Sequence, residues 1–273
     1  MIHLKLEKIT IYKGRFGINT ALWNDAVFDP NVGKNVYEEV KTVFITHGHA
    51  DHFADAYMLK DRAKIIAPKL ESNMIEDPTI NWRGLFSWAF LPGEMVTPYF
   101  HGRGVEVDDF AENHPFCVPL PGHTYAHVGY LVENVLIAGD AVYPPEYWQE
   151  FGILYYTDPD LMIESLYRML KLDWDYLIPG HGRIFDRDEG IGVIRYNIRT
   201  VEEIDRMIYS TIPEKGIRED DLIAEIAQLM KVRNLRSVIV LKPPIKGHLS
   251  SLYRRGLVSA EEREGYIIWK RFK

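Results

Sequence analysis

The seven residues from 46 to 52 read THGHADH and place four metal-capable side chains within six positions. The four are His47, His49, Asp51 and His52. They directly follow the apolar run Val43-Phe44-Ile45, which predicts a strand that ends where the histidines begin. The first two histidines can point to one side of such a loop, and the aspartate and last histidine lie a turn further on, where they can meet a second ion. Imidazole together with carboxylate suits zinc, iron or manganese.

Three further candidate ligands each follow an apolar run that predicts a strand. His123 comes after residues 120–122, Asp140 after residues 135–139, and His181 after residues 177–180. One such residue alone would be weak evidence, because a histidine after a strand is often an ordinary loop residue. Three at equivalent places, after a cluster of four, predict a single site at the edge of a sheet.

The bulk composition is that of a globular protein with a sizeable core. The chain has 273 residues, of which 47% are hydrophobic and 26% charged, values that are ordinary for folded domains. Its one cysteine, Cys117, cannot form an internal disulfide, so the fold does not depend on an oxidising compartment. The N-terminus does not resemble a signal peptide, and no apolar stretch approaches the roughly 20 residues that span a bilayer. We therefore expect a cytoplasmic location and no membrane contact.

The net charge of −7 is unevenly spread along the chain. Through residue 195 there are 17 Lys and Arg against 28 Asp and Glu, a net of −11; after it there are 15 against 11, a net of +4. An acidic body with a basic tail indicates two units of different purpose. We expect a catalytic domain over residues 1–195 and a second domain over residues 196–273. The total charge does not favour nucleic acid as a partner, although the tail alone leaves it open.

Short apolar runs alternate with helical patterns in the first of these units. Strands are expected at residues 5–12, 18–22, 42–46, 64–67, 116–120, 127–133 and 135–138. Helices are expected at residues 54–62, 68–75 and 159–172. This mixture predicts helices packed outside layers of strands, an α/β (α+β) architecture. Residues 77–114 are rich in aromatics, glycine and proline, which favours a lid or binding loop, or else an extra hairpin over the core.

The pattern changes in the second unit. Helical patterns cover residues 196–209, 219–230 and 244–255, and two short apolar segments then flank a charged turn. Three helices followed by a two-stranded hairpin are typical of a winged helix. The region also carries basic residues that face few acids in the sequence, namely Arg233, Arg236, Lys242, Lys246, Arg254, Arg255, Lys270, Arg271 and Lys273.

Four motifs together resemble the metallo-β-lactamase fold superfamily: HGHADH at residues 47–52, PGHT at 121–124, AGD at 138–140 and PGHG at 179–182. They stand in that family's order, and the resemblance extends over roughly residues 4–195. It implies an αββα sandwich with metal ions at one edge. Residues 246–258 are in turn similar to the winged-helix segment appended to some hydrolases of this kind.

The resemblance implies two metal ions, with zinc as the first expectation and iron or manganese as alternatives. The first ion would be held by His47, His49 and His123. The second would be held by Asp51, His52 and His181, with Asp140 shared between the two. Asp29, in a DPNVG stretch like the family's early aspartate motif, would support the ligands without binding metal. The sequence departs from many relatives at Tyr125-Ala126, where they have Pro-Gly, and His127 is interpreted as a structural residue.

The implied reaction is hydrolysis. Two ions that share a bridging water lower its pKa toward roughly 7, which gives a hydroxide that attacks a carbonyl or phosphorus. Asp51 would orient this nucleophile as well as bind metal. Tyr143 lies three residues after Asp140, a spacing similar to the tyrosine of N-acyl-homoserine lactonases in the superfamily, and its phenol could donate a hydrogen bond to the oxyanion. The other interpretation is that Tyr143 only packs.

We expect a small-molecule substrate with an ester, thioester or lactone bond. An apolar pocket could then be lined by Trp82, Phe86, Trp88, Tyr147 and Trp148. One alternative is a single-strand (ribo)nuclease guided by the basic tail, which the acidic body disfavours. Another is a mono-iron persulfide dioxygenase, because such enzymes and glyoxalase II share these ligand motifs. The C-terminal unit could also cover the active-site entrance or form a homodimer interface.

Overall fold

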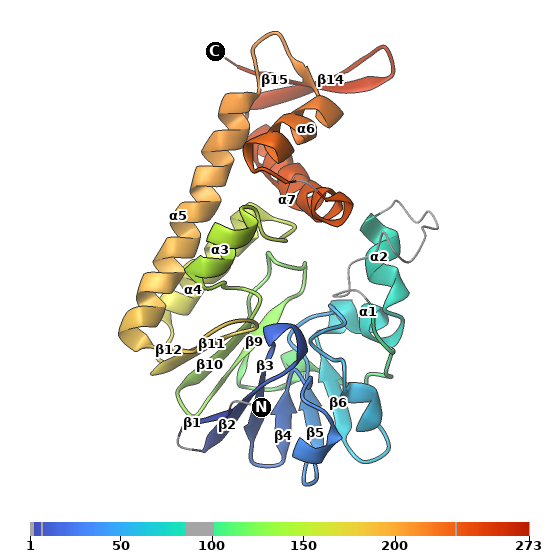
Figure 1. Ribbon diagram of the computed structural model, residues 1–273, viewed down its shortest axis with the longest axis vertical. Helices are drawn as coiled ribbons and strands as arrows, with labels where there is room; N and C mark the ends of the chain where they lie inside the picture. The colour runs from blue at the N-terminus through green and yellow to red at the C-terminus, as the bar shows by residue number, and fades with distance from the viewer. Residues whose placement is uncertain (1–2, 7, 86–100, 233, 273) are drawn as a thin grey trace.

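Two β-sheets packed face to face form the centre of the molecule (Figure 1). The structure is a computed structural model that describes residues 3–6, 8–85, 101–232 and 234–272. Helices lie outside the sheets, so the predicted αββα sandwich is confirmed. Among the described residues, no helix combines the length and the apolar character needed to cross a membrane.

The first sheet is formed by the N-terminal part of the chain, in the strand order β1-β2-β3-β4-β5-β6-β7. Neighbouring strands are antiparallel from β1 to β4 and parallel from β4 to β7. The strands are β1 (His3–Leu6), β2 (Ile9–Lys13), β3 (Asn19–Trp23), β4 (Ala26–Phe28), β5 (Thr42–Phe44), β6 (Lys64–Ala67) and β7 (Asp109–Phe110).

The second sheet has the order β12-β11-β10-β9-β8. Its strands are β8 (Cys117–Pro119), β9 (Val128–Val132), β10 (Val135–Gly139), β11 (Tyr176–Pro179) and β12 (Phe185–Asp186). The β9–β10 hairpin turns at Glu133 and Asn134, whose φ values of 47° and 57° suit a tight turn that matches the twist of the strands. β10 and β11 run parallel and therefore end at the same edge.

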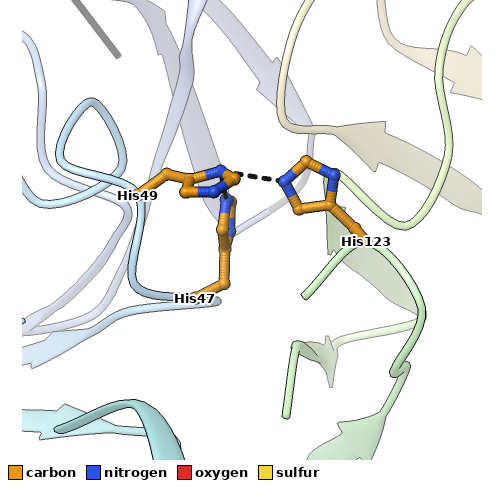
Figure 2. Close-up of side chains that lie close together, drawn as sticks. All are labelled: His47, His49 and His123. Carbon is orange, nitrogen blue, oxygen red and sulfur yellow. Dashed lines mark hydrogen bonds between the residues drawn. The ribbon is translucent and has the colours of Figure 1, made fainter. Parts of the chain in front are cut away.

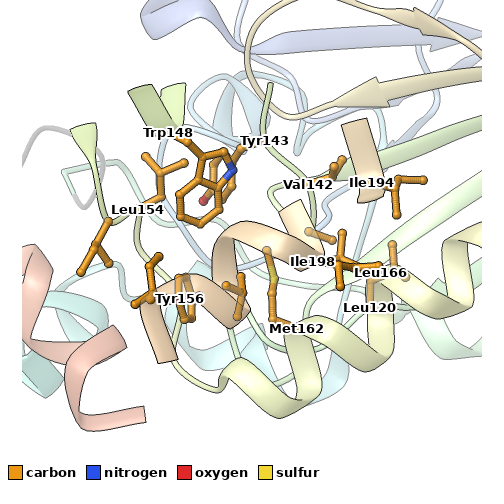
Figure 3. Packing of buried hydrophobic residues seen from close by; sticks show 14 of the residues in the cluster. Leu120, Val142, Tyr143, Trp148, Leu154, Tyr156, Met162, Leu166, Ile194 and Ile198 are labelled. Carbon is orange, nitrogen blue, oxygen red and sulfur yellow. The ribbon is translucent and has the colours of Figure 1, made fainter. Parts of the chain in front are cut away.

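Aromatic and aliphatic side chains from both sheets fill the space between them. Phe28 and Phe44 stack with ring centroids 5.1 Å apart, and Tyr130 from the second sheet packs against both. A larger core lies on the outer face of the second sheet, where α4 and α5 cover it (Figure 3). That core continues without a break into side chains of α6 and α7.

The helices are mostly in the second half of the chain. They are α1 (Ser72–Glu76), α2 (Thr79–Leu85), α3 (Pro145–Phe151), α4 (Pro159–Lys171), α5 (Arg187–Thr211), α6 (Glu219–Leu229) and α7 (Leu235–Arg254). A third, small sheet ends the chain in the order β13-β15-β14, with β13 (Ile217–Arg218), β14 (Val258–Arg263) and β15 (Tyr266–Arg271). Three helices and a hairpin thus follow in the predicted order, with β13 as an additional strand.

The expected domain boundary at residue 195 lies inside α5, a helix of 25 residues. This helix begins beside the second sheet, and its later turns belong to the same hydrophobic core as α6 and α7. Whether the parts on either side are separate domains stays a prediction.

Several expected elements differ in the structure. The helix expected at residues 54–62 is wrong: only a short 3-10 turn, Ala56–Met58, forms there. The reason is that buried Asp55 bonds Arg15, the Gly33 amide and the Tyr37 hydroxyl, which ties this segment down as a loop. The strand expected at residues 5–12 is a hairpin of β1 and β2. The third C-terminal helix begins at residue 235 instead of 244 and contains Pro243 and Pro244.

The tail is also less free to bind anions than its sequence suggests. Four of its expected cations lie within 3.1 Å of a carboxylate: Lys246 with Glu219, Arg254 with Asp160, Arg255 with Asp205, and Lys270 with Glu261. The sequence did not predict the pairs with Asp160 and Asp205, because these two carboxylates lie far from the tail in sequence, in α4 and α5. Arg233 and Lys273 lie outside the described residues.

Candidate metal centre

All seven predicted ligands converge at one edge of the sandwich. The loop after β5 brings the first four, while the others follow β8, β10 and β11. Their nitrogen and oxygen atoms form three groups, each within 4.8 Å: His47 with His49 and His123; His47 with His52 and Asp140; Asp51 with His52 and His181. The prediction that residues at the ends of strands meet at one sheet edge is therefore confirmed for these positions. Their role as metal ligands stays a prediction.

Three imidazoles make up what we call the three-histidine half (Figure 2). His49 Nδ1 lies 3.0 Å from His47 Nε2 and 2.9 Å from His123 Nε2. Three ring nitrogens that face one another at this distance can donate their lone pairs to one cation between them.

The mixed half combines two imidazoles with a carboxylate. His181 Nε2 lies 3.5 Å from Asp51 Oδ2, and His52 Nε2 lies 4.0 Å from the same oxygen. Asp140 stands between the halves, because its Oδ2 is 3.6 Å from both His123 Nε2 and His181 Nε2. This position is the one a shared, bridging carboxylate would need.

The ring nitrogen that faces away from the cluster is held in place in four of these histidines. His52 Nδ1 lies 2.7 Å from Asp29 Oδ2, and His47 Nδ1 lies 3.0 Å from the Thr46 hydroxyl. His123 Nδ1 donates to the carbonyl of Tyr155 at 2.9 Å, and His181 Nδ1 donates to that of Phe16 at 3.0 Å. Such outer partners fix the ring orientation and leave Nε2 free to bind metal.

Electrostatics separate the two halves. Burial lowers the pKa of His49 and of His123 to about 3, although Asp140 opposes this, so both rings are neutral and ready to coordinate. Burial would also lower the pKa of His52, but the Asp140, Asp29 and Asp51 carboxylates together raise it well above its usual value. Burial raises the pKa of Asp51. The rings of His49 and His123 in the three-histidine half are therefore neutral, whereas in the mixed half nearby carboxylates raise the pKa of His52.

Within the described part of the chain, some buried polar atoms of the mixed half and of Asp140 lack hydrogen bonds. Asp51 Oδ1, His52 Nε2 and Asp140 Oδ1 have no hydrogen-bond partner among the described residues, and the distance from His52 Nε2 to Asp140 Oδ1 is 3.5 Å. Leaving a buried charged group unsatisfied costs about 1–3 kcal/mol or more. A cation beside His52 Nε2 and Asp140 Oδ1 would satisfy both atoms, so the donor set fits a divalent metal.

Close backbone approach explains two glycines of the motifs. A Cβ on Gly180 would lie 2.1 Å from Asp140 Oδ1, and one on Gly139, whose φ is +51°, would lie 2.7 Å from His127 Nε2. Glycine is therefore needed for the strand ends to approach the ligands. His127 Nε2 accepts a hydrogen bond from the Asp140 amide at 3.1 Å, which agrees with its interpretation as a structural residue.

Glu71 is a supporting residue that the sequence did not reveal. It is buried, and its carboxylate accepts the Gly48 amide at 2.6 Å and the Ala126 amide at 2.9 Å. It thereby joins the loop that carries His47 and His49 to the loop that carries His123. A lone glutamate inside a predicted helix carries no signal of this role, since its partners are 23 and 55 residues away.

Tyr143 reaches the ligand cluster, as its spacing predicted. Its hydroxyl lies 2.8 Å from His123 Nδ1 and 3.3 Å from Asp140 Oδ2. Burial, followed by the nearby Asp140 carboxylate, raises the pKa of this phenol well above its usual value. Tyr143 therefore keeps its proton and can act as a hydrogen-bond donor.

A cavity of about 340 Å³ opens directly onto the cluster. Of the aromatics expected to line it, Tyr147 does so. Trp148 does not: it is buried in the core, where its indole donates to Asn197 at 2.8 Å. Trp82 is not among the lining residues, and Phe86 and Trp88 lie outside the described part of the chain.

Comparisons with known proteins agree with this arrangement. The family model described as metallo-beta-lactamase superfamily matches residues 38–181, just over half of the chain. A protein of Methanocaldococcus jannaschii named as a probable metallo-hydrolase is 24% identical over 166 residues, which cover 56% of this chain and 75% of that protein. The hydroxyacylglutathione hydrolase of Vibrio campbellii is 26% identical over 157 residues, 54% of this chain and 52% of that protein.

Two solved structures share the fold along almost the whole chain. A beta-lactamase domain protein from Burkholderia ambifaria superposes with a TM-score of 0.65 at 18% identity, covering 99% of this chain and 93% of that one. A metallo-beta-lactamase family protein from Thermus thermophilus gives 0.64 at 15% identity, with 97% and 93% covered. At these identities the matches establish the fold alone, and this likeness includes the residues beyond 195.

Proposed function

Because the chain belongs to the metallo-β-lactamase superfamily, as its motifs predicted, we propose that this metallo-hydrolase binds two divalent cations and cleaves a small-molecule ester, thioester or lactone. The observation that supports this most strongly is the convergence of seven candidate ligand side chains at one point, where five of them line the same cavity. Zinc is the proposed metal, with iron or manganese as the alternatives that the same ligands suit.

The three-histidine half would hold one cation and the mixed half the other, with Asp140 between them. A bound pair of cations supplies a nucleophile at neutral pH by lowering the pKa of water, and it polarises the substrate carbonyl. Asp51 lines the cavity, and its unpartnered Oδ1 can accept a hydrogen bond from the attacking water and orient it. The Tyr143 phenol can donate its proton to a hydrogen bond with the developing oxyanion.

The surroundings of the site favour a small substrate over a nucleic acid. A nuclease would need unpaired cations along the path of the phosphates. Four basic residues of the tail instead form ion pairs with carboxylates of the same chain. The cavity beside the cluster is lined largely by apolar side chains, which suit a small organic molecule.

Elemental analysis of the purified protein, paired with a panel of esters, thioesters, lactones and phosphodiesters, tests the proposal. We expect two metal ions per chain and turnover in one of the first three classes. His123→Ala should abolish turnover and lower the metal content. A matched variant, His114→Ala, removes a histidine 3.7 Å from Asp109, outside the cluster, and should change neither.

Other outcomes would replace the proposal. Cleavage of phosphodiesters alone would favour the nuclease. A single iron with oxygen consumption in the presence of a persulfide would favour the dioxygenase.

A further inference from the structure

The cavity has two chemically distinct sides. The ligand residues His49, Asp51, His123, Asp140 and His181 form one side. The other side is mostly apolar and is formed by Phe151, Ile153, Leu154, Val232, Val240 and Leu241, with the polar residues Asn234, Arg236 and Ser237 beside them. A molecule that fills the cavity therefore meets the cation site at one end and aliphatic or aromatic side chains at the other.

The apolar side is built from two distant parts of the chain. Phe151 ends α3, and the two residues at 153 and 154 follow it directly. Val240 and Leu241 belong to α7, which lies above α3 at the top of the sandwich (Figure 1). The C-terminal unit thus completes the wall of the cavity.

Exposure along this wall points to an apolar ligand. Leu241 is only 2% exposed and anchors α7 in the core, whereas Phe151 is 49% exposed. Val240 is partly exposed and lines the cavity. A ligand chain that covers such side chains removes apolar surface from water on both sides of the contact, which favours binding.

We propose that the cavity binds the aliphatic acyl chain of the substrate, with its carbonyl at the cation site and with Val240 of α7 setting the chain length. This rests on the proposed function, since it names the part of an ester, thioester or lactone that the same site recognises. Each methylene buried in such a pocket improves binding about fourfold. The cavity volume of about 340 Å³ lies at the low end for ligand pockets, so the gain should level off at a medium-length chain.

Hydrolysis of 4-nitrophenyl esters from acetate to dodecanoate by the metal-loaded protein tests the inference. We expect kcat/KM to rise about fourfold per methylene and then level off. Val240→Phe should narrow the cavity and lower the ratio of octanoate to butanoate kcat/KM at least tenfold. Val240→Ala should move the plateau to longer chains. The ratio is insensitive to differences in active fraction or metal loading between variants.

Val238→Phe is the matched control, because Val238 lies on the same helix and does not line the cavity. It should leave the octanoate-to-butanoate ratio unchanged. A wild-type profile that is flat with chain length would overturn the inference. So would a Val240→Phe variant that lowers all esters by the same factor, or a control that shifts the ratio equally.

Calorimetric binding of n-alkanoates, from butanoate to decanoate, separates this inference from the proposed function. If no ester is cleaved but alkanoate affinity still rises with length and falls in Val240→Phe, the acyl pocket stands and the hydrolase proposal fails. If esters are cleaved but neither kcat/KM nor alkanoate affinity depends on length, the hydrolase proposal stands and the acyl pocket fails.

Discussion

The three-histidine half and the mixed half of the ligand cluster lie side by side but are stabilised in different ways. In the first, burial keeps the rings of His49 and His123 neutral, and their nitrogens already face one another. In the second, the Asp51 and Asp140 carboxylates face His52 and His181, and several buried polar atoms have no hydrogen-bond partner among the described residues. The first half is therefore preformed, whereas the second needs an added charge to be satisfied.

This difference predicts that the two halves depend on different supports. Glu71 holds the loops of the three-histidine half together through backbone amides. Asp29 contacts the ring of His52 in the mixed half directly, whereas it reaches His47 of the three-histidine half only through the Thr46 hydroxyl. Substitutions at each support should therefore affect one cation more than the other.

The largest effect is expected at Asp140, which both halves share. Asp140→Asn should lower kcat/KM by more than the ~100-fold that loss of an outer partner costs, and metal content should fall for both cations. Mass spectrometry of bound metal and steady-state kinetics measure this. Asp173→Asn, at an exposed carboxylate, is the control and should match the wild type. Full metal content with normal turnover would show that Asp140 is not shared between the halves.

Tyr143→Phe should lower kcat on the order of 10²-fold, the loss typical of one oxyanion donor. Metal content should change little, because the shorter contact of the hydroxyl is to His123 Nδ1, on the side of the ring away from the cluster, and its contact with Asp140 Oδ2 is longer, at 3.3 Å. Tyr167→Phe, at an exposed tyrosine of α4, provides the control. Unchanged turnover on the true substrate would assign Tyr143 to packing alone.

Asp29→Asn should weaken metal binding roughly 10- to 100-fold at the mixed half. Asparagine keeps the side-chain shape and tolerates the positive φ of 48° at this position, so the backbone should not be strained. Competition with a chromophoric chelator measures the two affinities. Equal weakening of both cations would contradict the division into halves.

Glu71→Gln should have the smallest effect, about tenfold on metal affinity, and mainly at the three-histidine half. The glutamine oxygen can still accept one of the two amides that the carboxylate accepts, so one loop stays bound. Glu71→Ala removes both contacts and should weaken binding further. A Gln variant that is as poor as the Ala variant would show that the charge matters and the amide contacts do not.

The sequence predicted the convergence of the seven candidate residues because the relevant rule is simple. Side chains at the ends of strands reach the same edge of a sandwich, and β10 and β11 run parallel, so Asp140 and His181 had to meet. Periodicity likewise identified β6, and it identified α4 with its end placed one residue too far along the chain. It misjudged residues 54–62, because the buried contacts of Asp55 outweigh the helical pattern there.

The chain alone determined which residues can carry metal chemistry and in what order they follow one another along the strands. Only the tertiary structure decided which side chains surround them. Trp148 faces the core while α7 supplies Val240 to the cavity, and Glu71 links two loops that are far apart in sequence. The physical reason is that residue type indicates whether a side chain will be buried or paired. Which residues it packs against or pairs with depends on how distant segments of the chain come together.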